Sequence, residues 1–119
     1  MGDTDEQQLW VEQSRNGDHA AFAALIRAHQ PMIHSLTYRM TGSVSDCQDL
    51  AQETFIRAYQ QLDSFNGTSK FSSWLYRIAV NACLDWPRRE PTWLRSTRED
   101  SWKVIAHLAA SAVSKWSPM

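Results

Sequence analysis

Apolar side chains recur at intervals of three and four residues through most of residues 5–88, and this periodicity constrains the fold more than any other feature. No stretch in that range alternates apolar and polar residues between turn signals, as a half-buried strand would. The periodic segments are separated by clear stop signals. We therefore predict an all-α fold, a helical bundle of three main helices plus a short N-terminal helix, with an additional C-terminal helix.

The stop signals predict where the first two helices begin and end. A helix over residues 4–15 should end at Asn16-Gly17, and Asp18 can cap the next helix, which Gly42 should close. Pro31 lies inside that second helix. Because proline removes a backbone donor and crowds the preceding turn, we expect it to kink or split the helix near residues 29–30.

A third helix should follow a capping box over residues 45–48, and residues 63–69 have the composition of a loop. The fourth helix should begin near residues 70–72 and end or distort at Pro87. The side chains expected to face the core from these four helices are Leu9, Val11, Phe22, Leu25, Ile26, Ile33, Leu36, Met40, Leu50, Ala51, Phe55, Ala58, Tyr59, Leu62, Phe71, Trp74, Leu75, Ile78, Ala82 and Trp86.

The chain divides into two parts. Residues 1–90 form the main domain, and residues 91–119 form a linker and a tail helix of unknown role, opened by residues 96–99. The tail helix carries an apolar stripe that includes Trp102, Ile105 and Trp116. Such a stripe is costly to leave in water, so the tail either folds back on the domain or joins two chains.

Composition excludes several classes of protein. The 119 residues suit one domain, and 43% apolar with 21% charged residues is typical of a globular chain. We find neither a membrane span nor a basic, then apolar secretory leader, so we expect a cytoplasmic location and no membrane partner. Cys47 and Cys83 are expected to be small buried groups rather than a disulfide. We expect no enzyme activity, no cofactor and no metal site, because no residues have catalytic, phosphate-loop or ligand spacing.

The net charge of −1 conceals an asymmetry along the chain. Residues 1–62 carry four basic and eight acidic side chains, whereas residues 63–119 carry eight basic and five acidic ones. An acidic half and a basic half favour two different partners, and DNA is a candidate for the second. Chance variation among solvated faces is an alternative that charge alone leaves open.

Two segments carry a resemblance to a known family. The run from Leu50 to Tyr59, LAQETFIRAY, follows Asp49, and the run from Phe71 to Asp85, FSSWLYRIAVNACLD, precedes Arg88-Arg89. Both runs resemble extracytoplasmic-function (ECF) RNA polymerase sigma factors, in the region 2 domain and in that family's order. The resemblance covers roughly residues 5–90. Two linked matches of ten or more residues are far more specific than a short motif.

The resemblance implies two binding surfaces. The first is the polar side of the third helix, which in the family grips the clamp helices of the largest subunit of core RNA polymerase. An acidic and amide-bearing face would suit such a basic partner helix. The residues that the resemblance places there are Asp46, Asp49, Gln52, Glu53 and Arg57.

The second implied surface binds promoter DNA, where the family recognises and melts the minus-ten element and captures its non-template strand. Captured bases need pockets and the backbone needs cations. The loop, the outward side of the fourth helix and its basic end would supply them through Asn66, Gly67, Thr68, Ser69, Lys70, Ser73, Arg77, Val80, Asn81, Leu84, Arg88 and Arg89. The family continues the helix through this point, whereas Pro87 is expected to bend it here, so Arg88 and Arg89 would lie on a bent helix end. Asp85 could pair with either arginine.

Region 4, the family's second DNA-binding domain, is apparently absent from these 119 residues, since the segment after Glu90 is too short to hold it. The chain is then a fragment or a natural single-domain relative. The resemblance also leaves room for an anti-sigma factor as a partner. The alternative function is a polymerase-binding co-sigma or competitor protein without independent promoter recognition.

Overall fold

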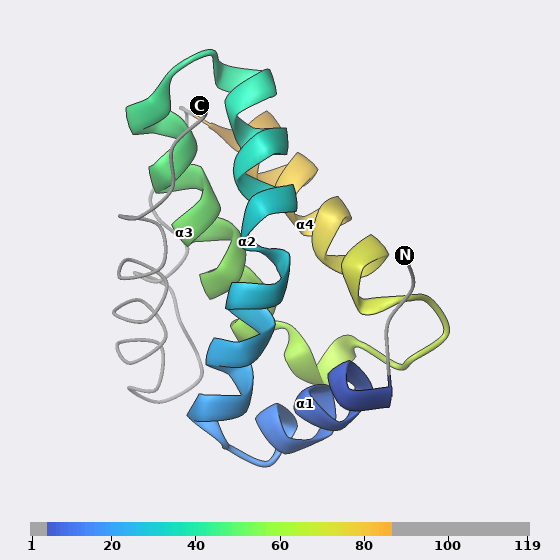
Figure 1. Cartoon of the computed structure of the whole chain (residues 1–119). Helices are drawn as coiled ribbons and strands as arrows, with labels where there is room; N and C mark the ends of the chain where they lie inside the picture. The colour runs from blue at the N-terminus through green and yellow to red at the C-terminus, as the bar shows by residue number, and fades with distance from the viewer. Residues whose placement is uncertain (1–4, 87–119) are drawn as a thin grey trace.

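The computed structural model describes residues 5–86, which are helical throughout apart from short connections (Figure 1). The elements are α1 (Asp5–Arg15), α2 (His19–Thr41), α3 (Val44–Gln60), the 3-10 turn η1 (Leu62–Ser64) and α4 (Phe71–Asp85). Within these residues the prediction of an all-α bundle is confirmed. The expected tail helix, Arg88 and Arg89 lie outside the described residues.

The predicted boundaries between α1, α2 and α3 follow from local chemistry. The Asp18 carboxylate accepts hydrogen bonds from the backbone N–H groups of Ala20 and Ala21, at 3.0 and 3.2 Å. It thereby satisfies two of the donors that the first turn of a helix leaves unpaired. Gly42 ends α2 at φ 70°, in the left-handed region that glycine adopts without strain.

The start of α3 corrects the sequence prediction. The cap is Ser43, two residues before the predicted capping box, and its hydroxyl accepts from the Asp46 backbone N–H at 3.2 Å. The Thr41 hydroxyl in turn accepts from the Ser43 N–H at 3.3 Å. Ser43 has an extended backbone, and α3 begins at the next residue, Val44.

Pro31 does not split α2, which runs unbroken from His19 to Thr41. A proline removes the hydrogen bond to the carbonyl four residues earlier, here that of Arg27. Pro31 and Arg27 are both exposed, so water can satisfy that carbonyl. The predicted split of this helix near residues 29–30 was therefore wrong.

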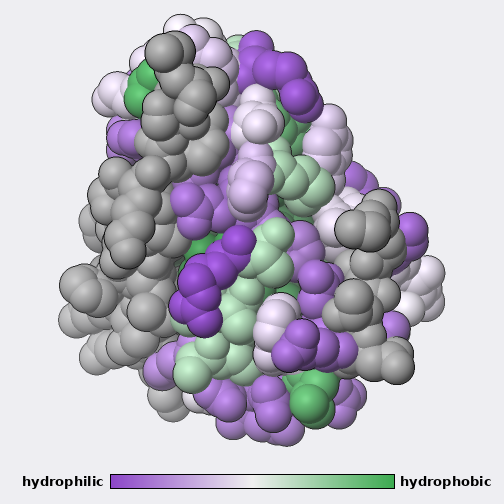
Figure 2. All heavy atoms as spheres, in the orientation of Figure 1, coloured by the Kyte–Doolittle hydropathy of each residue, from purple (hydrophilic) through white to green (hydrophobic). Residues whose placement is uncertain are grey.

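The core forms around α2, which contacts α1, α3 and α4 (Figure 1). Most predicted core positions are buried, but Leu9 and Met40 are 54% and 43% exposed and do not contribute. Among the large apolar residues that the helical pattern did not select, Ile56 on α3 and Phe65 in the loop are buried. In the view of Figure 2, the described apolar residues appear as small patches among hydrophilic ones.

Cys47 is fully buried and Cys83 is half-buried, and both are free thiols. Desolvation by burial raises the pKa of both, so they remain protonated at neutral pH. Within the described residues, no helix is both long and apolar enough to cross a bilayer.

Candidate nucleic-acid and protein interfaces

The outward side of α4 presents four of the predicted DNA-binding side chains. Ser73, Arg77 and Asn81 are exposed, and Leu84 is 61% exposed. Val80, which was expected on the same side, is only partly exposed and packs against the core. The exposed side of α4 is therefore polar along Ser73, Arg77 and Asn81, and Val80 lies closer to the core.

The loop before α4 has internal order that its composition did not predict. The Asn66 side-chain oxygen accepts hydrogen bonds from the Thr68 backbone N–H at 3.0 Å and from the Thr68 hydroxyl at 2.8 Å. Gly67, between them, has φ 80°, a conformation that other residues rarely adopt. This Asx turn gives the polar tip of the loop a defined shape.

Aromatic side chains anchor the loop to the helix bundle. Phe65 is 7% exposed, and its ring centroid lies 5.6 Å from that of Phe71 and 5.2 Å from that of Trp74. Trp74 and Phe71 are 5.5 Å apart. The loop is therefore held at its base by an aromatic cluster, while Thr68 and Lys70 stay exposed.

The loop and α4 enclose an open hollow of about 370 Å³. It is lined by Gln61, Ser64, Phe65, Asn66, Thr68, Ser69, Trp74, Arg77, Ile78 and Asn81. The structure thus brings five of the predicted DNA-binding residues to one place. Gly67, Lys70, Ser73, Val80 and Leu84 do not line it.

Sequence reasoning assigned five of the lining residues to no site: Gln61, Ser64, Phe65, Trp74 and Ile78. Gln61 and Ser64 come from the end of α3 and from η1, where nothing in the sequence pointed to a site. Trp74 was assigned to the core; it is partly buried there, but it also lines the hollow. An aromatic residue in the first turn after a polar loop was the available signal.

The hollow combines the chemistry that a single nucleotide needs. Aromatic and aliphatic side chains form part of its wall, and a base could pack against them. The Arg77 guanidinium can contact a phosphate, and the Asn81 amide can both donate to and accept from a base edge. The Asn66 amide nitrogen can donate to a base, while its oxygen is held by Thr68.

The predicted partner surface on α3 is only partly formed. Asp49 is exposed, and Asp46 and Gln52 are half-exposed on the same side of the helix. Partial desolvation, and then the negative charge of Asp46, raise the pKa of the Asp49 carboxyl. Asp46 and Asp49 repel each other, and a cationic partner bound beside them would offset this repulsion. The pair is therefore suited to bind basic groups.

Glu53 and Arg57, expected on that surface, are instead buried, at 4% and 8% exposed. The Arg57 Nε donates to the Glu53 Oε2 at 3.0 Å, and its Nη1 lies 3.1 Å from the Asp85 Oδ2 on α4. Glu53 and Arg57 thus form an ion pair inside the fold. Asp85 pairs with Arg57, whereas its alternative partners Arg88 and Arg89 lie outside the described residues.

Comparison with known proteins places this arrangement among related domains. Residues 25–91 match the family model described as Sigma-70 region 2. The chain is 46% identical over 80 residues to the ECF RNA polymerase sigma factor SigW of Bacillus subtilis, covering 67% of this chain and 43% of that protein. It is also 46% identical over 79 residues to the ECF RNA polymerase sigma-E factor of Escherichia coli K12, covering 66% of this chain and 41% of that protein.

A solved structure is similar as well, an NMR structure of an engineered region 2 of sigmaE in complex with GTAAAA. Its TM-score is 0.63 at 45% sequence identity, and the match covers 67% of this chain and 83% of that one. The match to the curated relatives spans about two fifths of their length.

Proposed function

This chain belongs to the Sigma-70 region 2 family, and on that premise we propose that it acts in transcription initiation by binding core RNA polymerase and the promoter minus-ten element. Residues 1–90 form the functional domain. The observation that carries the proposal is the hollow between the loop and α4, where Asn66, Arg77 and Asn81 converge beside aromatic side chains.

In this proposal the hollow receives one unstacked base of the non-template strand. Removing a base from the duplex costs stacking and pairing energy, which contacts to the captured base and its phosphates must offset. Melting then needs binding energy alone, without nucleotide hydrolysis. The engineered region 2 of sigmaE is in complex with GTAAAA, which supports the use of that hexamer as a probe for this chain.

Beyond the hollow, Gly67, Lys70, Ser73 and Leu84 flank the path of the strand. Lys70 and Arg77 supply positive charge to its phosphates. Arg88 and Arg89 are added to this DNA-binding surface because the family resemblance implies it, without support from the described residues.

The polymerase surface consists of Asp46, Asp49 and Gln52 on α3, facing a basic helix of the largest subunit. The buried ion pair between Glu53 and Arg57 holds α3 in place beneath this exposed surface. Charge complementarity of this kind sets orientation and association rate more than affinity.

DNA binding is tested by fluorescence anisotropy with labelled single-stranded GTAAAA, comparing the parent chain with Arg77→Gln and Asn81→Ala. We expect affinity losses of roughly tenfold, the scale of one phosphate or base contact. Arg39→Gln, an exposed arginine on α2 outside the hollow, is the charge-matched control. Equal binding of a scrambled hexamer, or equal binding by all four chains, would refute minus-ten recognition.

Polymerase binding is tested by pull-down of bacterial core RNA polymerase with the parent chain and with an Asp49→Asn/Gln52→Ala variant. We expect the variant to lose retention, while Glu6→Gln, an exposed acid on α1, retains it. Polymerase binding without hexamer binding would instead support the co-sigma or competitor function. Failure of the parent to bind polymerase would exclude both.

A further inference from the structure

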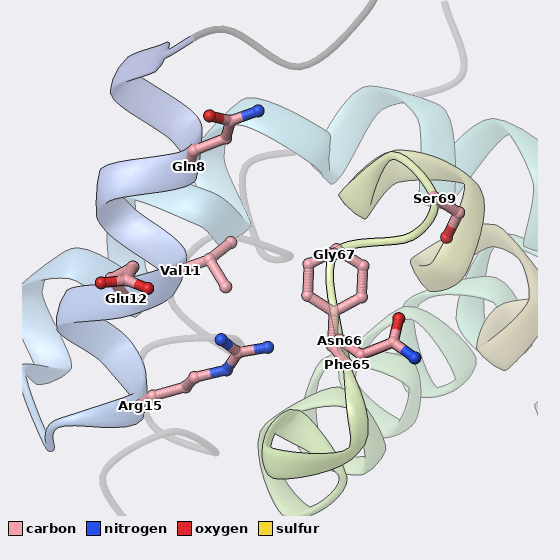
Figure 3. A pocket seen from close by; sticks show the side chains of 8 residues that line it. All are labelled: Gln8, Val11, Glu12, Arg15, Phe65, Asn66, Gly67 and Ser69. Carbon is pink, nitrogen blue, oxygen red and sulfur yellow. The ribbon is translucent and has the colours of Figure 1, made fainter.

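A second hollow lies on the opposite side of the loop, between the loop and α1 (Figure 3). It measures about 320 Å³ and is lined by Gln8, Val11, Glu12 and Arg15 of α1 and by Phe65, Asn66, Gly67 and Ser69 of the loop. α1 precedes residues 25–91, so the match to the family model assigns it no role.

The two hollows share a wall. Phe65, Asn66 and Ser69 line both of them, so the loop alone separates the space beside α4 from the space beside α1. Gly67 at the tip has no side chain, and the position where its Cβ would lie has no atom within 4 Å. The space next to the loop tip is therefore open, and a nucleic-acid strand that runs from the first hollow to the second would cross the loop there.

Arg15 gives the second hollow its chemistry. Its guanidinium points from α1 toward the loop, with Cζ 5.7 Å from the centroid of the Phe65 ring (Figure 3). Its Nε is buried, and no described residue accepts a hydrogen bond from it. Within residues 5–86, moreover, Arg15 forms no ion pair, in contrast to Arg57, which pairs with Glu53 and Asp85.

A guanidinium that lines a hollow is suited to a phosphate, because its planar fork matches two phosphate oxygens. The rest of the wall suits the attached nucleoside rather than a second phosphate. Val11 offers an apolar surface, the Gln8 amide can donate and accept, and the Glu12 carboxylate would repel further negative charge.

We propose that this hollow is a second nucleotide subsite, in which Arg15 binds the phosphate of a nucleotide next to the one held beside α4. This inference rests on the proposed function, because it requires that the first hollow bind a single strand. It adds α1 to the DNA-binding surface and makes the loop a divider between two successive nucleotides.

The test is a scan with neutral phosphates. Single-stranded GTAAAA and versions extended by two thymidines at the 5′ or the 3′ end are each prepared with one methylphosphonate linkage, moved along the strand. For the parent chain we expect sensitive linkages at the phosphates that Lys70 and Arg77 contact, and one further linkage at which neutralisation weakens binding, on the order of fivefold or more. For Arg15→Gln the same neutralisation should have no further effect, and the salt dependence of binding should fall by about one phosphate contact.

Two controls separate this site from a structural role of Arg15. Arg27→Gln makes the same change at an exposed position on α2 and should keep the linkage-specific loss. Arg15→Lys retains the charge and should recover part of the effect. A purely structural Arg15 would weaken every oligonucleotide equally and would still leave the sensitive linkage in Arg15→Gln, which would overturn the inference. If the parent binds the hexamer but no linkage depends on Arg15, only the inference fails; if the parent binds no hexamer, the proposed function fails with it.

Discussion

Arg57 on α3 lies 3.1 Å from Asp85 in the last turn of α4, measured from Nη1 to Oδ2. The same guanidinium donates from Nε to Glu53 at 3.0 Å. One buried arginine thus joins the helix proposed to bind polymerase to the end of the helix proposed to bind DNA. A shift of either helix would have to break a charged contact.

Replacing Arg57 tests this connection. Arg57→Met should lower the free energy of unfolding by about 3 kcal/mol, because it leaves the buried Glu53 carboxylate without this partner. Adding Glu53→Gln to that variant should recover part of the loss. Urea unfolding followed by circular dichroism measures both effects. Asp85→Asn should cost less than about 1 kcal/mol, because the Asp85 side chain is half exposed to water; an equally large loss there would contradict this account.

His34 should make the fold sensitive to mild acid. It is fully buried, and desolvation lowers its pKa to about 4 from 6.5. The unfolded chain therefore binds a proton at this position between pH 6.5 and pH 4 while the folded chain does not, so stability falls as the pH drops through that window. Between pH 7 and pH 5 this contribution amounts to about 2 kcal/mol.

The variant for this prediction is His34→Leu, which cannot titrate. Its free energy of unfolding should change less between pH 7 and pH 5 than that of the parent, as measured by urea unfolding at both values. If the free energy of unfolding changed equally with pH in the two chains, the folded chain would take up a proton at His34 over the same pH range as the unfolded chain, which would contradict this prediction.

Gly42 and Gly67 provide a matched pair of substitutions. Both have positive φ, at 70° and 80°, and a Cβ at either position would meet no atom within 4 Å. Alanine at either position should therefore lower the free energy of unfolding by about 1–2 kcal/mol through backbone strain alone. Only Gly67→Ala should also weaken hexamer binding, because only Gly67 shapes the loop, and thermal unfolding with anisotropy separates the two outcomes. Weakened binding in Gly42→Ala would indicate a general loss of structure instead.

Asp46→Asn should lower the pKa of Asp49 without returning it to the ordinary range. The charge of Asp46 is the second cause of the raised pKa, and partial desolvation, the larger cause, remains in the variant. Titration of the Asp49 carboxyl by carbon-detected NMR measures the change. An unchanged pKa would mean that the two carboxylates do not interact on the surface of α3.

Local features of the sequence determined the helical part of this fold. The helical spacing of apolar residues, the Asp18 cap and the stop at Gly42 act within a few residues of themselves, and the structure contains each of them. The outward positions of Ser73, Arg77 and Asn81 follow from the same helical period. These features needed no knowledge of how the helices pack.

Only the tertiary structure decided which polar residues of α3 meet solvent and which line a hollow. Glu53 lies four residues from Asp49 on α3, yet Glu53 is buried and Asp49 exposed, because Arg57 binds Glu53 and Asp85 across the contact of α3 with α4. Phe65 and Trp74 likewise acquire their roles by packing against Phe71. Local periodicity assigns a residue to one side of a helix, but burial depends on what the rest of the chain places against that side.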